Sequence, residues 1–126
     1  MEDWNIIKNK LYFLDGSLRD ILIYNMSCED WEKWINYVNA SCCLEFKNHS
    51  NNISKSIDYT FIKNMWDTKN VDIIDFYATI NLGGILVNCW FNGMKELEQD
   101  IDPKEFITIQ HHNKLMNYLK NRFKII

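Results

Sequence analysis

The sequence predicts a single α+β domain over residues 1–126, with a mostly antiparallel sheet of about five or six strands packed by two main helices at about 28–39 and 108–124. Residues 71–93 contain two runs rich in β-branched and aromatic residues on either side of Gly83-Gly84, a hairpin pattern. Both helical segments place apolar residues three and four apart. At 126 residues and 47% apolar content, including five Trp, the chain can bury one core.

The first third of the chain predicts a short helix or turn that leads into a strand at about 10–14. Asp15-Gly16 is a turn signal, and residues 18–24 (LRDILIY) supply the return strand. One face of such a strand carries Leu18, Asp20, Leu22 and Tyr24, and the opposite face carries Arg19, Ile21 and Ile23. Because neither face is purely polar, we expect this strand in the interior of the sheet.

The helix at 28–39 has the clearest local signals. Ser27 and Asp30 have the spacing of a capping box. The apolar stripe of this helix comprises Trp31, Trp34, Ile35 and Val38. Residues 42–47 (CCLEFK) then predict a strand, followed by a polar loop at 48–54. Residues 56–66 are compatible with a strand or a helix, and we favour a short helix at about 58–66, capped by Asp58.

A loop at Gly83-Gly84 fixes the register of the central hairpin, with Leu82 opposite Ile85. One face then carries the core pairs Ile80–Val87, Ala78–Cys89 and Phe76–Phe91. The other, which we call the mixed face, carries Asn81–Leu86, Thr79–Asn88, Tyr77–Trp90 and Asp75–Asn92. A slip of one residue would exchange the two faces, so burial tests the register.

Residues 95–101 predict an edge strand with Leu97 and Ile101 on its buried face and Glu96, Glu98 and Asp100 on its exposed face. Asp102-Pro103 starts a turn of helix. Thr108 can cap the C-terminal helix, whose inner stripe is Ile109, His112, Leu115, Met116, Leu119 and Phe123.

Composition limits the classes of function. The formal charge of −3 and the sequence pI of about 5.5 give no cationic footprint for nucleic acid or acidic membranes. A local basic patch could form at Lys114, Lys120, Arg122 and Lys124, but solvated charges on a helix explain these residues as well. No apolar run approaches the roughly 18 residues of a membrane span, and the first residues lack signal-peptide features. We therefore expect a cytoplasmic protein without a nucleic-acid or membrane partner.

The sequence shows no catalytic pattern. It lacks a glycine-rich phosphate loop, a serine elbow, an HExxH motif and zinc-ligand spacing, and no carboxylate pair stands out. Its four cysteines form no CxxC pair, which favours free thiols in a reducing cytoplasm. His111 and His112 point about 100° apart on a helix, and His112 is expected inward as a hydrogen-bonded residue. We predict no catalytic residue, metal or cofactor.

The candidate site is therefore a surface. Tyr77 and Trp90 offer amphipathic rings beside short polar groups, as protein-binding surfaces often do. Alternatively, a helix covers this face and the rings are core, which is common for half-polar strands. The acids of 95–101 could seat a basic protein, or could be a solvated edge. Together they predict a partner-binding surface of Tyr77, Trp90, Asp75, Asn88, Asn92, Glu96, Glu98 and Asp100.

Most of the chain also resembles small bacterial α+β proteins of uncharacterised families, some of them associated with polymorphic toxin systems as immunity proteins. The segments that carry the resemblance are GSLRDILIYN, EDWEKWINYVN, LVNCWF, ELEQDIDPKE and HNKLMNYL. The abundance of Ile, Lys and Asn, typical of an AT-rich genome, agrees with a bacterial source. The resemblance implies a non-enzymatic protein that binds and neutralises a partner toxin, and it carries over no functional residue.

Three hypotheses of function follow. The first is a cytoplasmic, non-enzymatic protein-interaction module of the immunity kind, with a basic protein as its partner. The second is a small-ligand-binding or enzymatic domain with a pocket near Tyr77, Trp90 and His112. The third is a homodimer that buries the mixed face on itself.

Overall fold

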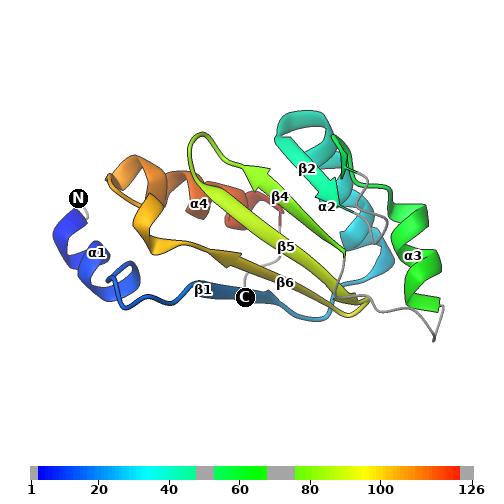
Figure 1. The fold of residues 1–126 in the computed structure, drawn as a ribbon, viewed down its shortest axis with the longest axis horizontal. Helices are drawn as coiled ribbons and strands as arrows, with labels where there is room; N and C mark the ends of the chain where they lie inside the picture. Colours follow the sequence, from blue (N-terminus) through cyan, green and yellow to red (C-terminus); the bar gives the residue numbers. More distant parts are fainter. Residues whose placement is uncertain (1–2, 48–52, 68–75, 123–126) are drawn as a thin grey trace.

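The computed structural model describes residues 3–47, 53–67 and 76–122, and it shows one antiparallel sheet packed with helices (Figure 1). In chain order the helices are α1 (Trp4–Leu11), α2 (Cys28–Ser41), α3 (Tyr59–Asp67) and α4 (Ile109–Arg122), with a 3-10 turn, η2 (Pro103–Glu105), before α4. The strands are β1 (Arg19–Ile23), β2 (Cys43–Lys47), β3 (Ile53–Ser54), β4 (Tyr77–Asn81), β5 (Leu86–Gly93) and β6 (Glu96–Ile101). The predicted α+β class is confirmed.

The order of strands in the sheet is β1-β6-β5-β4-β2-β3, and all pairings between these described strands are antiparallel. The register predicted for the hairpin of β4 and β5 is confirmed, since Ile80 pairs with Val87 and Tyr77 pairs with Trp90. Gly83 and Gly84 have φ angles of 66° and 106°, which a glycine pair adopts without steric cost. Asp75 lies outside the described residues.

One face of the sheet is covered by helices. In Figure 1, α2 and α4 lie behind the sheet and α3 lies at one end of it. Trp34 of α2 packs on Phe91 of β5 with ring centroids 6.1 Å apart, and Trp66 of α3 donates to the Phe91 carbonyl. The residues predicted for the core face of the hairpin are all buried: Phe76, Ala78, Ile80, Val87, Cys89 and Phe91. The core therefore lies between this face and the helices.

The local predictions for the helices agree with the structure. Ser27 and Asp30 form the capping box of α2, which runs two residues further than expected, to Ser41. Residues 59–67 are helical, and Asp58 accepts a hydrogen bond from the Phe61 N–H. The helix predicted at 108–124 is described over 109–122 as α4, and the Asp102-Pro103 turn is η2.

The short helix predicted near the N-terminus is confirmed as α1, but the strand predicted after it at about 10–14 was wrong. Residues 10–14 form no strand, because α1 runs to Leu11 and is capped by Asp3. The following loop sends Tyr12 into the core while Phe13 and Leu14 stay exposed, and the Arg19 guanidinium holds it by binding the Leu11 and Phe13 carbonyls. Asp15-Gly16 turns the chain without forming a hairpin.

Two strands were placed wrongly in the sheet. The strand predicted at 18–24 was expected in the interior, but β1 is an edge strand that, among the described strands, pairs only with β6. The strand at 95–101 was expected at the edge, but β6 lies between β1 and β5. Pairing between distant segments decides these positions, and the alternation of residues within one strand does not report it.

Candidate functional site: the mixed face of the sheet

The mixed face is the side of the sheet opposite to α2 and α4, and no described helix crosses it in Figure 1. Strand pairing extends it beyond the hairpin into two rows that each cross five strands. The first row is Asp20, Asp100, Asn88, Thr79 and Glu45. The second row is Leu22, Glu98, Trp90, Tyr77 and Lys47. The structure thus places the aromatic pair beside acidic residues of β6 on one face of the sheet.

Asp100 organises the first row. The residue is only 8% exposed, and each carboxylate oxygen has a donor: Asn88 Nδ2 lies 2.9 Å from Oδ1 and Trp90 Nε1 lies 2.8 Å from Oδ2. Thr79 donates its hydroxyl to Asn88 Oδ1 at 3.0 Å. A continuous chain of hydrogen bonds therefore crosses three strands and fixes the Trp90 indole against the sheet.

The aromatic pair lies beside this chain. Tyr77 and Trp90 are both half-buried, and their ring centroids are 5.1 Å apart at an interplanar angle of 32°. Lys47 Nζ lies 5.8 Å from the centroid of the Tyr77 ring. The alternative in which a helix buries these rings does not hold for the described residues, because the rings keep part of their surface accessible.

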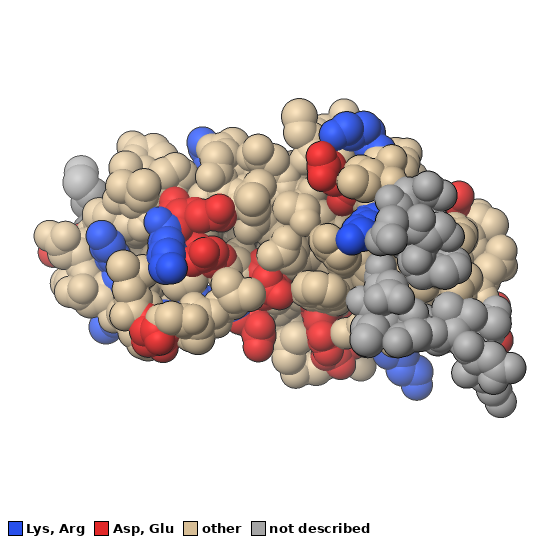
Figure 2. All heavy atoms as spheres, viewed as in Figure 1, with Lys and Arg blue, Asp and Glu red and all other residues tan. Residues whose placement is uncertain are grey.

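An acidic hollow of about 360 Å³ opens between β1, β6 and β5. Its lining residues on the mixed face are Asp20, Leu22, Trp90, Asn92, Glu98 and Asp100. Asn92 Nδ2 donates to Glu98 at 2.7 Å, so that carboxylate is also held in place. Figure 2, in the orientation of Figure 1, shows acidic side chains over this part of the sheet. Carboxylates beside an indole ring suit a cationic group.

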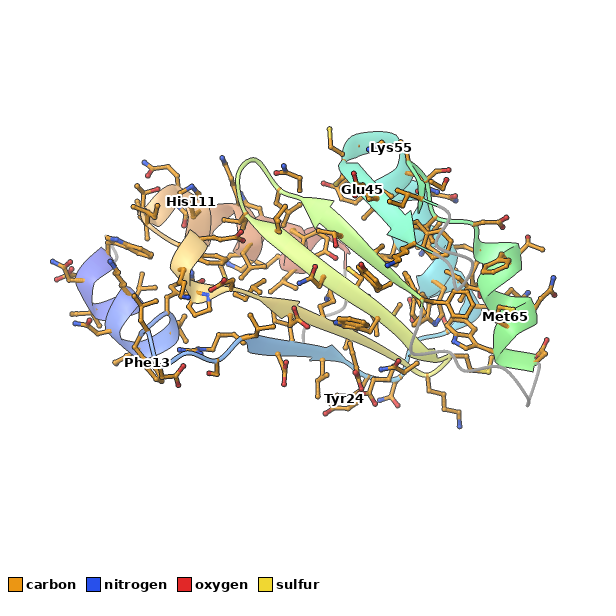
Figure 3. All side chains as sticks on the ribbon, in the orientation of Figure 1. Phe13, Tyr24, Glu45, Lys55, Met65 and His111 are labelled. Atoms are coloured by element: carbon orange, nitrogen blue, oxygen red, sulfur yellow. The ribbon has the colours of Figure 1, made fainter. Side chains whose placement is uncertain are left out.

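A second hollow, of about 650 Å³, lies at the other end of the mixed face. Its lining includes Cys43, Glu45, Lys55, Thr79 and Asn81. Lys55 and Glu45 form an ion pair of 3.1 Å at its rim, and Figure 3 shows them side by side. Most of these side chains are exposed, so the hollow is a wide groove.

Seven of the eight predicted site residues are described, and the eighth, Asp75, lies outside the described residues. Six of them are on the mixed face around the acidic hollow or the aromatic pair: Tyr77, Asn88, Trp90, Asn92, Glu98 and Asp100. Glu96 is half-buried at the start of β6, opposite Gly93. Sequence reasoning missed Asp20 and Leu22, although their shared parity was visible, because nothing local indicated that β1 pairs with β6.

His112 does not belong to this site. It is buried on the helix-covered side, where its Nδ1 lies 2.6 Å from the Tyr12 hydroxyl, and Tyr12 stacks on Phe106 at 4.2 Å. The sheet separates His112 from Tyr77 and Trp90, so the predicted pocket of these three residues is wrong. The buried, hydrogen-bonded position of His112 agrees with the prediction that this residue points inward. Burial raises the pKa of Tyr12 to about 12.

The interior also holds a polar cluster on the helix-covered side. The Tyr118 hydroxyl accepts from Trp34 Nε1 at 2.8 Å and donates to the Gln99 carboxamide oxygen, which lies 3.6 Å from the Cys89 sulfur. Burial raises the pKa of the Cys89 thiol well above its usual value. A thiol in this environment is a poor nucleophile at neutral pH.

Neither metal binding nor membrane insertion finds support in the described segments. Over residues 3–47, 53–67 and 76–122, no group of three or more His, Cys, Asp or Glu side chains is arranged to hold a metal ion. Within the same residues, no helix is long and apolar enough to cross a membrane.

Comparison of the chain with protein-family models, with curated proteins and with solved structures finds no significant match.

Proposed function

We propose that this protein is a non-enzymatic interaction module that binds a basic partner protein through the mixed face. The observation that carries the proposal is the acidic hollow beside the Tyr77–Trp90 pair, on a face of the sheet that no described helix covers. The sequence resemblance to immunity proteins suggests that the partner is a toxin and that binding neutralises it.

The mixed face has the physical features of a protein-binding surface. Trp90 offers a large ring that is already fixed by its bond to Asp100, so little side-chain entropy is lost when a partner covers it. Aromatic residues at the centre of an interface commonly contribute most of the binding free energy. Asp20, Glu98 and Asp100 supply negative charge around this ring, which would speed encounter with a cationic surface and make the affinity fall with salt.

The chemistry of the described residues supports a non-enzymatic role. The buried histidine binds a core tyrosine, and the buried thiol is held protonated by its surroundings. The most buried carboxylate in the lining of the hollow, Asp100, uses both oxygens to hold neighbouring side chains. None of these groups is presented as a nucleophile or a general base to a bound substrate.

The test is capture of protein partners from a lysate of the source organism. The wild type is compared with Trp90→Ala and with Glu98→Lys, and Glu32→Lys serves as the control because Glu32 is exposed on α2, behind the sheet. The proposal predicts a discrete basic protein that is retained by the wild type and the control and lost with both mixed-face variants. Equal retention by all four proteins would contradict it.

A second candidate, small-ligand binding, is favoured by the groove of about 650 Å³, whose size lies in the range of ligand pockets. Thr79, Asn81 and Glu45 would supply its polar contacts. Native mass spectrometry of the purified protein tests it. A co-purifying small molecule that is lost in Thr79→Val, with no protein captured, would favour this candidate over the interaction module.

The homodimer hypothesis requires the mixed face to be buried between two copies. Light scattering at several protein concentrations distinguishes it. A dimer that dissociates in Trp90→Ala would support this hypothesis, whereas a concentration-independent monomer leaves the mixed face free for a different protein.

A further inference from the structure

Within the part of the chain that the structure describes, the outer edge of β1 is an open end of the sheet. β1 is the terminal strand, and no strand among the described residues pairs with it on the side away from β6. An edge strand presents a row of backbone N–H and C=O groups, and the structure that satisfies such a row is another extended chain. The backbone of this edge therefore specifies the shape of an occupant.

The two edges of the sheet differ in how they are protected. At the far edge, β3 has only two residues and is followed by Lys55, and short strands and lysines both discourage pairing with other chains. β1 has five residues with neither lysine nor proline. Around it, Leu18, Leu22 and Tyr24 are 52%, 40% and 62% exposed, and Figure 3 shows Tyr24 at the open side of the sheet. β1, whose charged residues are Arg19 and Asp20, is the less protected of the two edges.

The mixed face determines which side chains an added strand would need. Every second residue of that strand would lie on the mixed face, opposite Leu18, Asp20, Leu22 or Tyr24. Asp20 already pairs with Asp100 on its inner side, and like charges directly opposite each other are unfavourable. A lysine or arginine opposite Asp20 would offset this repulsion, and its neighbours on the same face would be apolar.

Charge argues against a second copy of this chain as the occupant. Two copies could pair antiparallel along the whole of β1, with Ile21 opposite Ile21. Asp20 would then lie opposite Leu22 of the second copy, so the pairing would bring no cationic side chain to Asp20. It would also join two acidic mixed faces in one continuous sheet, between chains that each carry a formal charge of −3. A different, basic chain fits the edge better.

We propose that a partner protein adds an extended segment to the outer edge of β1, antiparallel or parallel, with alternating apolar and basic residues and a lysine or arginine opposite Asp20. This inference rests on the proposed function, because it specifies how a basic partner engages the acidic side of the mixed face. Asp20 and Leu22 belong both to the edge strand and to the lining of the acidic hollow, so the two contacts are continuous.

A defined peptide tests the inference. The probe is Val-Thr-Val-Thr-Lys-Thr-Val, which, when antiparallel to β1, places its lysine opposite Asp20 and valines opposite the apolar positions. A matched peptide has glutamate in place of lysine. Binding is followed by the NMR spectrum and amide hydrogen exchange of the full chain at millimolar peptide. The variants are Asp20→Lys and, as control, Glu32→Lys on the other side of the sheet.

The inference predicts slower exchange at alternate amides of β1 and about fivefold tighter binding of the lysine peptide than of the glutamate peptide. Asp20→Lys should reverse this preference, and Glu32→Lys should leave it unchanged. Absence of β1 protection, equal binding of the two peptides, or β1 amides already protected by dimerisation of the free protein would overturn it. A different result is that Glu98→Lys still abolishes capture of the partner from lysate while neither peptide protects the β1 amides. That result would overturn strand addition at β1 and leave the proposed function supported.

Discussion

Replacement of Asp100 separates its role as a hydrogen-bond acceptor from its charge. In Asp100→Ala, Trp90 Nε1 and Asn88 Nδ2 both lose an acceptor in a largely buried position. Loss of these bonds should lower the free energy of unfolding by about 2 kcal/mol. With a urea dependence of roughly 1.5 kcal/mol per molar for a domain of this size, the unfolding midpoint should fall by about 1.3 M.

Asp100→Asn should behave differently, because the chain of bonds can invert. The new carboxamide oxygen would accept from Trp90, and its N–H would face Asn88. If the Asn88 amide turns over, its oxygen accepts this bond and its nitrogen donates to the Thr79 hydroxyl. Only the amide oxygen and nitrogen of Asn88 exchange places. The expected cost is below about 1 kcal/mol.

Urea unfolding followed by tryptophan fluorescence measures both changes. Asp20→Asn is the control, because Asp20 is exposed and its replacement should shift stability by less than about 0.5 kcal/mol. Equal destabilisation by Asp100→Ala and Asp100→Asn would refute the inverted chain of bonds. An unchanged midpoint in Asp100→Ala would show that the Asp100 bonds do not stabilise the mixed face.

Two further predictions concern the interior. Tyr118→Phe removes the acceptor of the buried Trp34 N–H and should lower the free energy of unfolding, measured in urea, by about 1–3 kcal/mol. The control Tyr24→Phe, at an exposed position, should change it little. Similar values for both variants would contradict a stabilising role of the polar cluster. An unfolded tyrosine has a pKa near 10.0, whereas burial raises the pKa of Tyr12 in the folded protein to about 12. Because the unfolded state loses this proton first, the free energy of unfolding should fall as pH rises from about 10 to about 12. Tyr12→Phe should lessen that fall, and an identical pH profile would count against it.

Features set by neighbouring residues could be predicted from the sequence. The register of β4 and β5 follows from the position of Gly83-Gly84 and from strict alternation, so the buried and mixed faces of the hairpin were assigned correctly. The capping box at Ser27 similarly marks the start of α2. In each case the residues that give the signal are close in the sequence to the element that they specify.

Features that depend on distant contacts could not be predicted. β1 and β6 are far apart in the sequence, and their pairing places Asp20 directly beside Asp100, which charge alone would argue against. The apolar run after α1 reads as a strand until Arg19 is known to bind the carbonyls of Leu11 and Phe13. The acidic hollow depends on the same distant pairing, since β1 contributes two of its lining residues, Asp20 and Leu22.

The measurement that tests the central claim most directly is the affinity of the captured partner as a function of salt. Isothermal titration of the wild type, Glu98→Lys and the Glu32→Lys control over a range of salt concentrations provides it. Binding through the mixed face predicts an affinity that falls with salt for the wild type and the control, and weaker binding with a flatter salt dependence for Glu98→Lys. Three superimposable curves would contradict the assignment of the mixed face as the binding surface.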